Sequence, residues 1–404
     1  MVNSLVLTFL LILSGCTGAA VSPDKVKSPI LRVGYLSEDH FEQRFGNIVS
    51  LEFPNYRLEI VPIKDMIRNR LPAGEWVESN RLDLIYAPSS SFKDLIDSGS
   101  LVELDTYMKR DSFLEDAVIP SVMKLTRAYG NGNVYGLPTN FDSKVIVYNQ
   151  DQFDRLKVPY LTDGMTWPEL FNVIQRLDGG LSVHSSSPFH LLALMGQSEQ
   201  LQMMNAQNQS VTLNNPAWNK LWDITASAVK NGGIYFDDVN ENPFLTGERA
   251  AALISYDEYK VLEQNAPSFK WDMVMLPTAA SLQGKTTSIT ADGYWAIPAG
   301  SSNPDEAWKL IQFFMSDKAA KWGYRSIYGF STLVQQFSLN AENNGRLEAF
   351  YRGDPLVPFA QDWPDYLLGL VNDLFAKIVE GSISVDTGLQ ELQESITQRL
   401  NEVT

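Results

Sequence analysis

Eight polar side chains follow the predicted strands of this chain, at positions where a small molecule can be hydrogen-bonded. In an open sheet with helices on its faces, ligands sit outside the carboxyl ends of the strands. The positions that meet this condition are Glu38, Asp39, Ser89, Ser90, Asn140, Asp142, Asp257 and Asp292. Helix capping or plain solvation is the alternative for each loop carboxylate. Asp142 and Asp292 stand out because both lie where the chain is predicted to cross between two halves of the fold.

Aromatic side chains form a second set of candidates, because their flat faces can stack on the apolar faces of a ligand. Those near predicted strand ends or crossings are Tyr256, Tyr294, Trp295, Tyr328, Trp363 and Tyr366. Each ring could equally pack in a core. Trp295 lies inside an apolar strand and is predicted to be core, whereas Tyr294 alternates with it and is predicted to face the site. Tyr294 is therefore kept as a ligand-binding candidate.

The sequence carries no recognised catalytic or metal-binding motif. It contains no G-x-S-x-G, P-loop, H-E-x-x-H or G-x-G-x-x-G pattern. Its one cysteine is Cys16, and its three histidines (His40, His184 and His190) are far apart. His190 starts a predicted helix and is a weaker ligand candidate; His40 and His184 are predicted to be structural. We therefore expect no enzyme, cofactor or metal, although two placed carboxylates could still serve a glycosidase.

The candidate residues surround one stretch, Tyr135–Asn149, which begins as a polar turn and becomes the buried strand Lys144–Tyr148. Other strands are predicted at Ile30–Leu36, Tyr56–Ile63, Arg81–Ala87 and Trp271–Pro277. A short buried strand, Ala251–Ser255, is predicted after a helix that stops at Gly247. Helices are predicted at Phe92–Ser98, capped by the preceding serines, and over a region from Thr166 to about Lys230, interrupted at Gly179-Gly180 and at Leu213–Pro216. The pattern Thr166-Trp-Pro-Glu169 predicts the start of this region, with Thr166 as the cap. Further helices are predicted at Asn303–Phe314, with Asn303 as the cap, and at Trp363–Glu380 and Val385–Val403. This alternation predicts an α/β fold with mainly parallel sheets.

Composition limits the partners of the chain. Its 404 residues are enough for two domains, and the formal charge of −16 argues against nucleic acid, whose phosphates need lysine and arginine. The same charge argues against an electrostatic hold on anionic lipid.

The pattern of the N-terminal residues predicts a secretion signal peptide. Leu5–Leu13 is an apolar run too short to span a membrane. The ending Leu13-Ser14-Gly15-Cys16 resembles the bacterial lipobox, in which the cysteine is lipidated, although Met1–Ser4 lacks the usual positive charge. We expect a signal peptide over 1–15, lipidation at Cys16 and a linker over 16–29 that ties the protein to the outer face of the bacterial cell membrane.

Motifs in order along the chain resemble the extracellular solute-binding proteins of ABC transporters, in the maltose-binding-like (family 1) group. The matching passages are Pro138…Tyr148-Asn149…Phe153, Thr166-Trp167…Leu170, Phe244…Gly247…Ala250-Ala251, Gly293…Ile297-Pro298, Pro304…Ala307-Trp308 and Ile378–Leu389. Two departures are the missing methionine near Ala252 and a glycine run reduced to Ala291-Asp292-Gly293.

The resemblance implies a two-lobe periplasmic-binding-protein-like fold (type II) with hinge crossovers. One lobe would hold residues 30–139 and 293–335, and the other 140–292 and 336–404. It further implies capture of a carbohydrate, expected to be an oligosaccharide, and its delivery by a monomer to the permease subunits of an ABC importer. The family places a ligand-stacking aromatic at Tyr256 and the start of its last cleft helix near Trp363 and Tyr366. The resemblance therefore adds these three rings to the ligand-binding candidates, since a flat ring can stack on the C–H face of a sugar. Tyr256→Ala and Asp142→Ala are then expected to lower affinity with little loss of stability. A non-sugar solute and a ligand-sensing receptor remain open alternatives.

Overall fold

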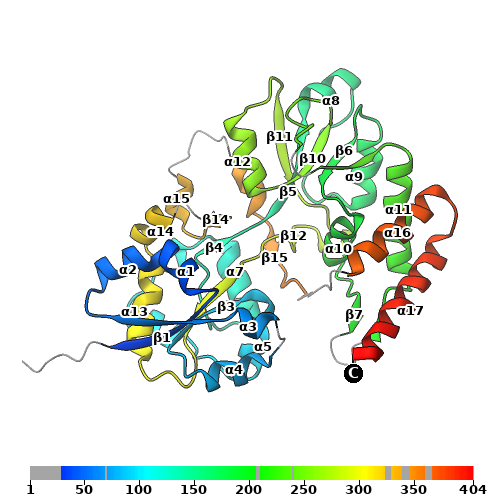
Figure 1. Ribbon diagram of the computed structural model, residues 1–404. Coiled ribbons are helices and arrows are strands. Elements are labelled where there is room, and N and C mark those ends of the chain that lie inside the picture. The colour runs from blue at the N-terminus through cyan, green and yellow to red at the C-terminus, as the bar shows by residue number, and fades with distance from the viewer. Residues whose placement is uncertain are drawn as a thin grey trace, which may run out of the picture.

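Two separate sheets organise the part of the chain that the structure describes. The computed structural model describes residues 29–68, 71–205, 210–238, 241–323, 329–338, 345–359 and 366–403. Its α/β architecture confirms the predicted fold class, and Figure 1 shows the sheets in different halves of the molecule. We call the half built on the four-stranded sheet lobe 1 and the half built on the five-stranded sheet lobe 2.

The sheet of lobe 1 has the strand order β13-β3-β1-β2. Its strands are β1 (Ile30–Tyr35), β2 (Arg57–Pro62), β3 (Leu84–Pro88) and β13 (Gly293–Ala296). The first three run parallel and β13 runs antiparallel to β3, with Gly293 opposite Pro88 and Ala296 opposite Ile85. A strand that arrives from late in the chain therefore completes this sheet.

Helices surround the sheet of lobe 1. They are α1 (Glu38–Phe41), the π-helical segment η1 (Glu42–Gly46), α2 (Asn47–Glu52), α3 (Lys64–Arg68), α4 (Ala73–Ser79), α5 (Ser89–Asp97), α6 (Asp105–Arg110), η2 (Glu115–Ala117), α7 (Pro120–Tyr129), α13 (Pro304–Phe314), α14 (Asp317–Gly323) and α15 (Val334–Ser338). Asn303 was predicted to cap α13, but its side chain makes no capping hydrogen bond. The buried Asp83 carboxylate accepts the Ser302 and Asn303 N–H groups instead, at 3.0 and 3.1 Å.

The sheet of lobe 2 has the order β11-β5-β10-β6-β9. Its strands are β5 (Lys144–Asn149), β6 (Leu181–His184), β9 (Ile234–Asp237), β10 (Ala251–Ser255) and β11 (Trp271–Met275). The predicted strand at Lys144–Tyr148 is confirmed, and it lies between β10 and β11 in antiparallel register. β6 and β9 lie in regions where no strand was predicted, and the residues before Gly247 form turns rather than a helix.

Helices cover both faces of this second sheet. They are α8 (Gln150–Leu156), α9 (Trp167–Ile174), α10 (Pro188–Ser198), α11 (Pro216–Lys230), α12 (Tyr256–Gln264), α16 (Tyr366–Glu380) and α17 (Val385–Val403). Thr166 and Glu169 form the capping box that starts α9, as the Thr-Trp-Pro-Glu pattern predicted. Short elements complete the lobe: β7 (Met204–Asn205), β8 (Ser210–Val211), η3 (Ala280–Leu282), β12 (Lys285–Thr286), η5 (Arg346–Phe350) and β15 (Asp354–Pro355).

Three segments connect the lobes side by side. β4 (Asn140–Phe141) pairs with β14 (Phe330–Ser331), and Asp142 bridges to Thr290 through two backbone hydrogen bonds of 2.8 and 2.9 Å. Gly329 has a φ of 84°, and a Cβ there would lie 2.4 Å from the Phe141 carbonyl oxygen, so only glycine fits this close approach. The apolar core of lobe 1 continues through Phe141 and Phe330 into one face of the lobe 2 sheet.

Candidate functional site

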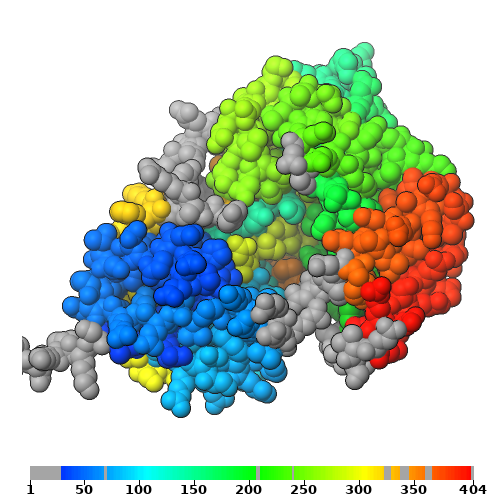
Figure 2. Space-filling model, viewed as in Figure 1, coloured from blue at the N-terminus to red at the C-terminus, as the bar shows by residue number. Residues whose placement is uncertain are grey.

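A hollow lies between the two lobes. Figure 2 shows it between the blue atoms of lobe 1 and the green and orange atoms of lobe 2, with teal, yellow and brown atoms at its bottom. The colour key assigns those atoms to the region of the connecting segments. In each lobe, the parallel strands end on the side from which these connections leave. The hollow is thus bordered by strand ends, where open α/β sheets bind ligands.

Asn140 joins side chains of two connecting regions and of lobe 1. Its Oδ1 accepts a hydrogen bond from Arg44 Nη2 at 3.0 Å, and its Nδ2 donates to Asp292 Oδ2 at 3.3 Å. Asn140 is buried, with 1% of its surface exposed, whereas Arg44 is half-buried and Asp292 is exposed. Since the amide has a donor on one side and a carboxylate on the other, its orientation is fixed. The cluster therefore presents a guanidinium and a carboxylate in a set geometry.

Arg44 was not among the predicted site residues. It lies in η1, a single π-helical turn between α1 and α2, and such turns occur frequently at functional sites. Arg44 Nη1 also donates to the Tyr35 hydroxyl at 3.5 Å. Burial raises the pKa of Tyr35, with Asp292 adding to the rise and Arg44 opposing it, so this phenol stays protonated and able to donate. No sequence motif marks Arg44, because its contacts lie 9 and 96 positions away.

The other predicted polar residues of lobe 1 lie at helix starts. Glu38 and Asp39 are exposed in the first turn of α1, which Ser37 caps by accepting the His40 N–H at 3.2 Å. Ser89 and Ser90 are half-buried first residues of α5, and neither caps the helix as predicted, since its N-cap is Pro88. The Ser89 N–H donates to the Asp292 carbonyl oxygen at 3.1 Å, which places Ser89 beside Asp292.

Asp142, Tyr256 and Asp257 lie on the lobe 2 side of the connections. Burial raises the pKa of the Asp142 carboxyl, and Lys144 with the Ser143 and Tyr256 backbone N–H groups offsets part of that rise. The Tyr256 ring stacks on Phe330 with centroids 3.5 Å apart, and Lys260 Nζ lies 5.0 Å from its centre. Asp257 is exposed and pairs with Lys260 at 2.6 Å. The Tyr256 ring therefore already has packing partners in this conformation.

Tyr294 is a correction to the sequence prediction. It was expected to face the site, but it is 0% exposed and stacks on Phe92 at 4.0 Å. Trp295, predicted to be core, is also 0% exposed, and it stacks on Tyr35 on the other side of the sheet. Alternation distinguishes a buried from a solvated face only when one face is open, and here helices cover both.

Three residues singled out from the sequence lie outside the described part of the chain: Cys16, Tyr328 and Trp363. Tyr366 begins α16, is half-buried, and carries the Arg399 guanidinium 4.2 Å from its ring centre. Tyr366 therefore packs against the helices of lobe 2 rather than presenting a free ring.

Two histidines of lobe 2 lie at the end of β6 and in the helix that follows it. His184 Nδ1, at the end of β6, is hydrogen-bonded to Glu258 of α12, and only 7% of the His184 side chain is exposed, as predicted for a structural residue. His190 is exposed, with Nδ1 2.9 Å from Ser185 Oγ, and burial together with Lys144 lowers its pKa. A neutral His190 can accept or donate a hydrogen bond to a solute. Among the described residues there is no group of three metal-ligating side chains.

This arrangement defines a class of protein. Two α/β lobes, three adjoining connections and polar strand ends around a hollow suit reversible capture of a small solute by hinge motion. Within the residues that the structure describes, no helix is long and apolar enough to cross a membrane.

Comparison with known proteins supports this class. The family model of the bacterial extracellular solute-binding proteins matches residues 59–343, so the chain belongs to that family. A curated relative, the putrescine/cadaverine-binding protein of Pseudomonas aeruginosa, is 25% identical over 301 residues, 71% of this chain and 73% of its own length. The predicted resemblance to the extracellular solute-binding proteins is therefore confirmed.

Solved structures with a similar fold cover nearly the whole chain. The family 1 solute-binding protein of Alicyclobacillus acidocaldarius has a TM-score of 0.69 and 14% identity, covering 92% of this chain and 98% of its own. The sugar-binding protein MalE of Xanthomonas citri has a TM-score of 0.67 and 15% identity, covering 93% and 98%. These likenesses confirm the predicted periplasmic-binding-protein-like fold.

Proposed function

We propose that the protein captures a carbohydrate, an oligosaccharide in the first instance, between its lobes and delivers it to the permease of an ABC importer. The observation that carries the proposal is the Arg44–Asn140–Asp292 cluster at the connections. A guanidinium donor beside a carboxylate acceptor matches adjacent sugar hydroxyls, each of which both donates and accepts. The MalE-like fold supports the same solute class.

Hydrogen bonding carries more of this proposed recognition than stacking. The rings of Tyr256 and Tyr294 already pack on Phe330 and Phe92. A sugar bound between the lobes would contact Arg44 and Asp292 from lobe 1 and its connection, and Asp257 or His190 from lobe 2. Contacts with both lobes stabilise the closed form, because the solute then binds it more tightly than the open form. The permease would recognise that form.

A thermal-shift screen against mono- and oligosaccharides tests the proposal, using the chain from Ser22 onward. A solute at 100 times its dissociation constant adds about 2.7 kcal/mol to the free energy of unfolding, which raises Tm by a few degrees. Chromatography of the recovered sugar tests the companion proposal that the protein is a binder and not an enzyme. Intact sugar supports it, and cleavage products would instead indicate a glycosidase.

A diamine is the second candidate solute. Glu38, Asp39 and Asp257 are exposed carboxylates at strand ends in the two lobes, and the Pseudomonas aeruginosa relative is named for putrescine and cadaverine. Carboxylates on both sides of a hollow suit a solute with an ammonium group at each end. The same screen decides between the solutes, because a shift with diaminobutane or diaminopentane alone would replace the sugar assignment.

We further propose that Cys16 is lipidated and holds the protein at the outer surface of the cell membrane. Mass spectrometry of the membrane fraction tests this, with Cys16→Ser as the variant expected to be released. A protein that stays membrane-bound after this substitution would overturn the anchor. Reconstitution tests whether the protein serves transport or ligand sensing. Uptake of the solute with the permease encoded by a neighbouring gene would indicate transport, and a response of a sensor kinase encoded nearby would indicate sensing.

A further inference from the structure

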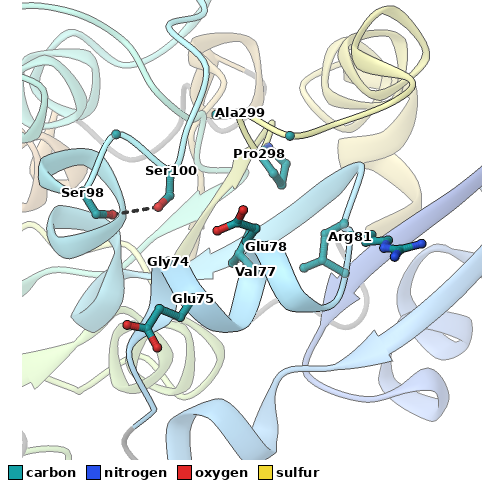
Figure 3. Close-up of a pocket in the computed structure, with 12 residues that line it drawn as sticks. Gly74, Glu75, Val77, Glu78, Arg81, Ser98, Ser100, Pro298 and Ala299 are labelled. Carbon is teal, nitrogen blue, oxygen red and sulfur yellow. Dashed lines mark hydrogen bonds between the residues drawn. The ribbon is translucent and has the colours of Figure 1, made fainter.

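A cavity of about 800 Å³ lies within lobe 1, away from the hollow between the lobes. Its walls come from α4, from the turn that ends α5 and from the turn after β13. Figure 3 shows Gly74, Val77 and Glu78 on one side and Ser98, Ser100 and Pro298 on the other. None of these residues contributes to the candidate solute site.

The cavity and the solute site lie at opposite edges of the same sheet. β3 ends at Pro88, beside Gly293, next to Ser89 and Asp292 of the solute site. It begins at Leu84, just after cavity residue Leu82, and β13 ends at Ala296, just before cavity residue Pro298. A five-residue strand spans about 15 Å. A molecule in the cavity would therefore not touch a solute between the lobes, and hinge motion would leave the cavity walls unchanged.

The inner wall of the cavity is apolar. Val77 and Leu82 line it and are only 3% and 1% exposed. Gly300 also lines it, and a Cβ built on Gly300 meets no heavy atom within 4 Å, so that position opens onto free space. This wall can hold an alkyl chain.

Two side chains that border the cavity offer hydrogen-bond acceptors. Ser98 Oγ donates its one proton to the Leu95 carbonyl oxygen at 3.2 Å, so in the 2.8 Å contact between Ser98 and Ser100 the proton comes from Ser100. Lone pairs of Ser100 Oγ remain available. The Glu78 carboxylate points into the space toward Ser100 and Pro298, while Glu75 and Arg81 point away from it (Figure 3). Among the described residues, the Glu78 side chain has no hydrogen bond or ion pair.

We propose that this cavity is a second binding site, for a small primary alkylamine or diamine. Its ammonium group would donate to the Glu78 carboxylate and Ser100 Oγ, and its methylene chain would lie against Val77 and Leu82. An ammonium supplies three donors and no acceptor, which complements the Glu78 carboxylate and the Ser100 hydroxyl oxygen. The site is independent of the solute assigned to the hollow, because it uses no residue of that site.

Calorimetric titration of the full chain with 1,5-diaminopentane, paired with hydrogen–deuterium exchange, tests the proposal. The amine is expected to slow exchange in residues 73–82, 98–100 and 298–300. Glu78→Gln is expected to weaken binding about tenfold or more, since it removes a charge-assisted hydrogen bond. Glu75→Gln is the matched control, with the same charge change on the same helix, and is expected to weaken binding at most about threefold. Gly300→Phe is expected to fill the space and abolish binding.

Three results would overturn the second site. One is an equal loss in Glu75→Gln and Glu78→Gln, which would indicate only a general electrostatic attraction. Another is protection confined to the connecting segments 137–144 and 287–292, which would place the amine between the lobes alone. The third is no heat and no protection at millimolar amine. If Gly300→Phe does not fold, the comparison of Glu75→Gln with Glu78→Gln still decides.

Discussion

Asn140 and Asp292 are 152 positions apart in the chain, yet the Asn140 amide Nδ2 lies 3.3 Å from the Asp292 carboxylate. Each residue belongs to a different segment that connects the lobes. The contact thus couples the two connections at the point where Arg44 of lobe 1 reaches the same amide. A solute that binds Asp292 would therefore contact the connecting segments, which must bend when the lobes close.

Asp292→Asn is expected to weaken solute binding with little effect on stability. Asp292 is exposed, so the free protein loses no buried charge, but a solute hydroxyl or ammonium would lose a charged acceptor. The expected loss is about tenfold or more in affinity, measured by calorimetry with a solute found in the screen. Asp223→Asn, an exposed change on α11, is the control. Unchanged affinity in Asp292→Asn would remove this residue from the site.

Tyr256→Ala is expected to destabilise the protein, contrary to the expectation from sequence alone. The substitution removes a ring that stacks on Phe330, which is itself 1% exposed between the lobes. The expected cost is about 1–3 kcal/mol, measured by urea unfolding. Tyr256→Phe keeps the stack and serves as the control. If alanine at this position leaves stability unchanged but lowers solute affinity, the ring is a ligand platform after all.

Local patterns predicted the elements whose signals lie within a few residues. The β-branched run after Lys144 predicted β5, and the capping pattern at Thr166 predicted the start of α9. β6 was missed because it is a four-residue strand directly after Gly179 and Gly180, and the glycine pair was interpreted as an interruption of a helix. In the structure these glycines have positive φ values of 84° and 63°. A Cβ on Gly179 would lie 1.9 Å from the Glu248 carbonyl oxygen, so these glycines serve a packing contact that only the fold creates.

The sequence predicted those residues of the candidate solute site that follow the ends of strands. Asn140 was a candidate at the predicted hinge and Asp292 was one at a predicted crossing, and the structure brings their side chains into contact. Arg44 was missed because it lies in a π-helical turn that brings its side chain to Asn140. Tyr294 was wrongly predicted to face the site because both faces of its strand are covered. In each case the deciding neighbour is distant in sequence, so no pattern in a short window could identify it.

The Asp142 carboxyl should make stability depend on pH in a defined direction. Its pKa is raised by burial, so the folded state holds this proton more tightly than the unfolded chain does. The resulting stabilisation is fully present below the ordinary aspartate pKa of about 3.9 and is lost as the pH rises through the folded pKa. Asp142→Asn has no such proton, so its stability relative to wild type should increase from pH 4 to pH 7. If the free energies of unfolding of wild type and Asp142→Asn, measured in urea, keep a constant difference from pH 4 to pH 7, the pKa of Asp142 is not raised in the folded protein.

The Glu258 carboxyl should act in the opposite direction. Burial alone would raise its pKa, but hydrogen bonds from His184 and the Ser255 backbone N–H outweigh burial and lower it. The stabilisation is therefore present above the ordinary glutamate pKa of about 4.3 and is lost as the pH falls through the lower, folded pKa. Glu258→Gln is expected to cost about 1–3 kcal/mol at pH 7, because it breaks both the capping box of α12 and the bond to buried His184. The gap to wild type in urea unfolding should narrow below pH 4.5, while Glu391→Gln, an exposed change on α17, should show no such trend. A gap that stays constant with pH would mean that Glu258 acts through packing alone and not through its charge.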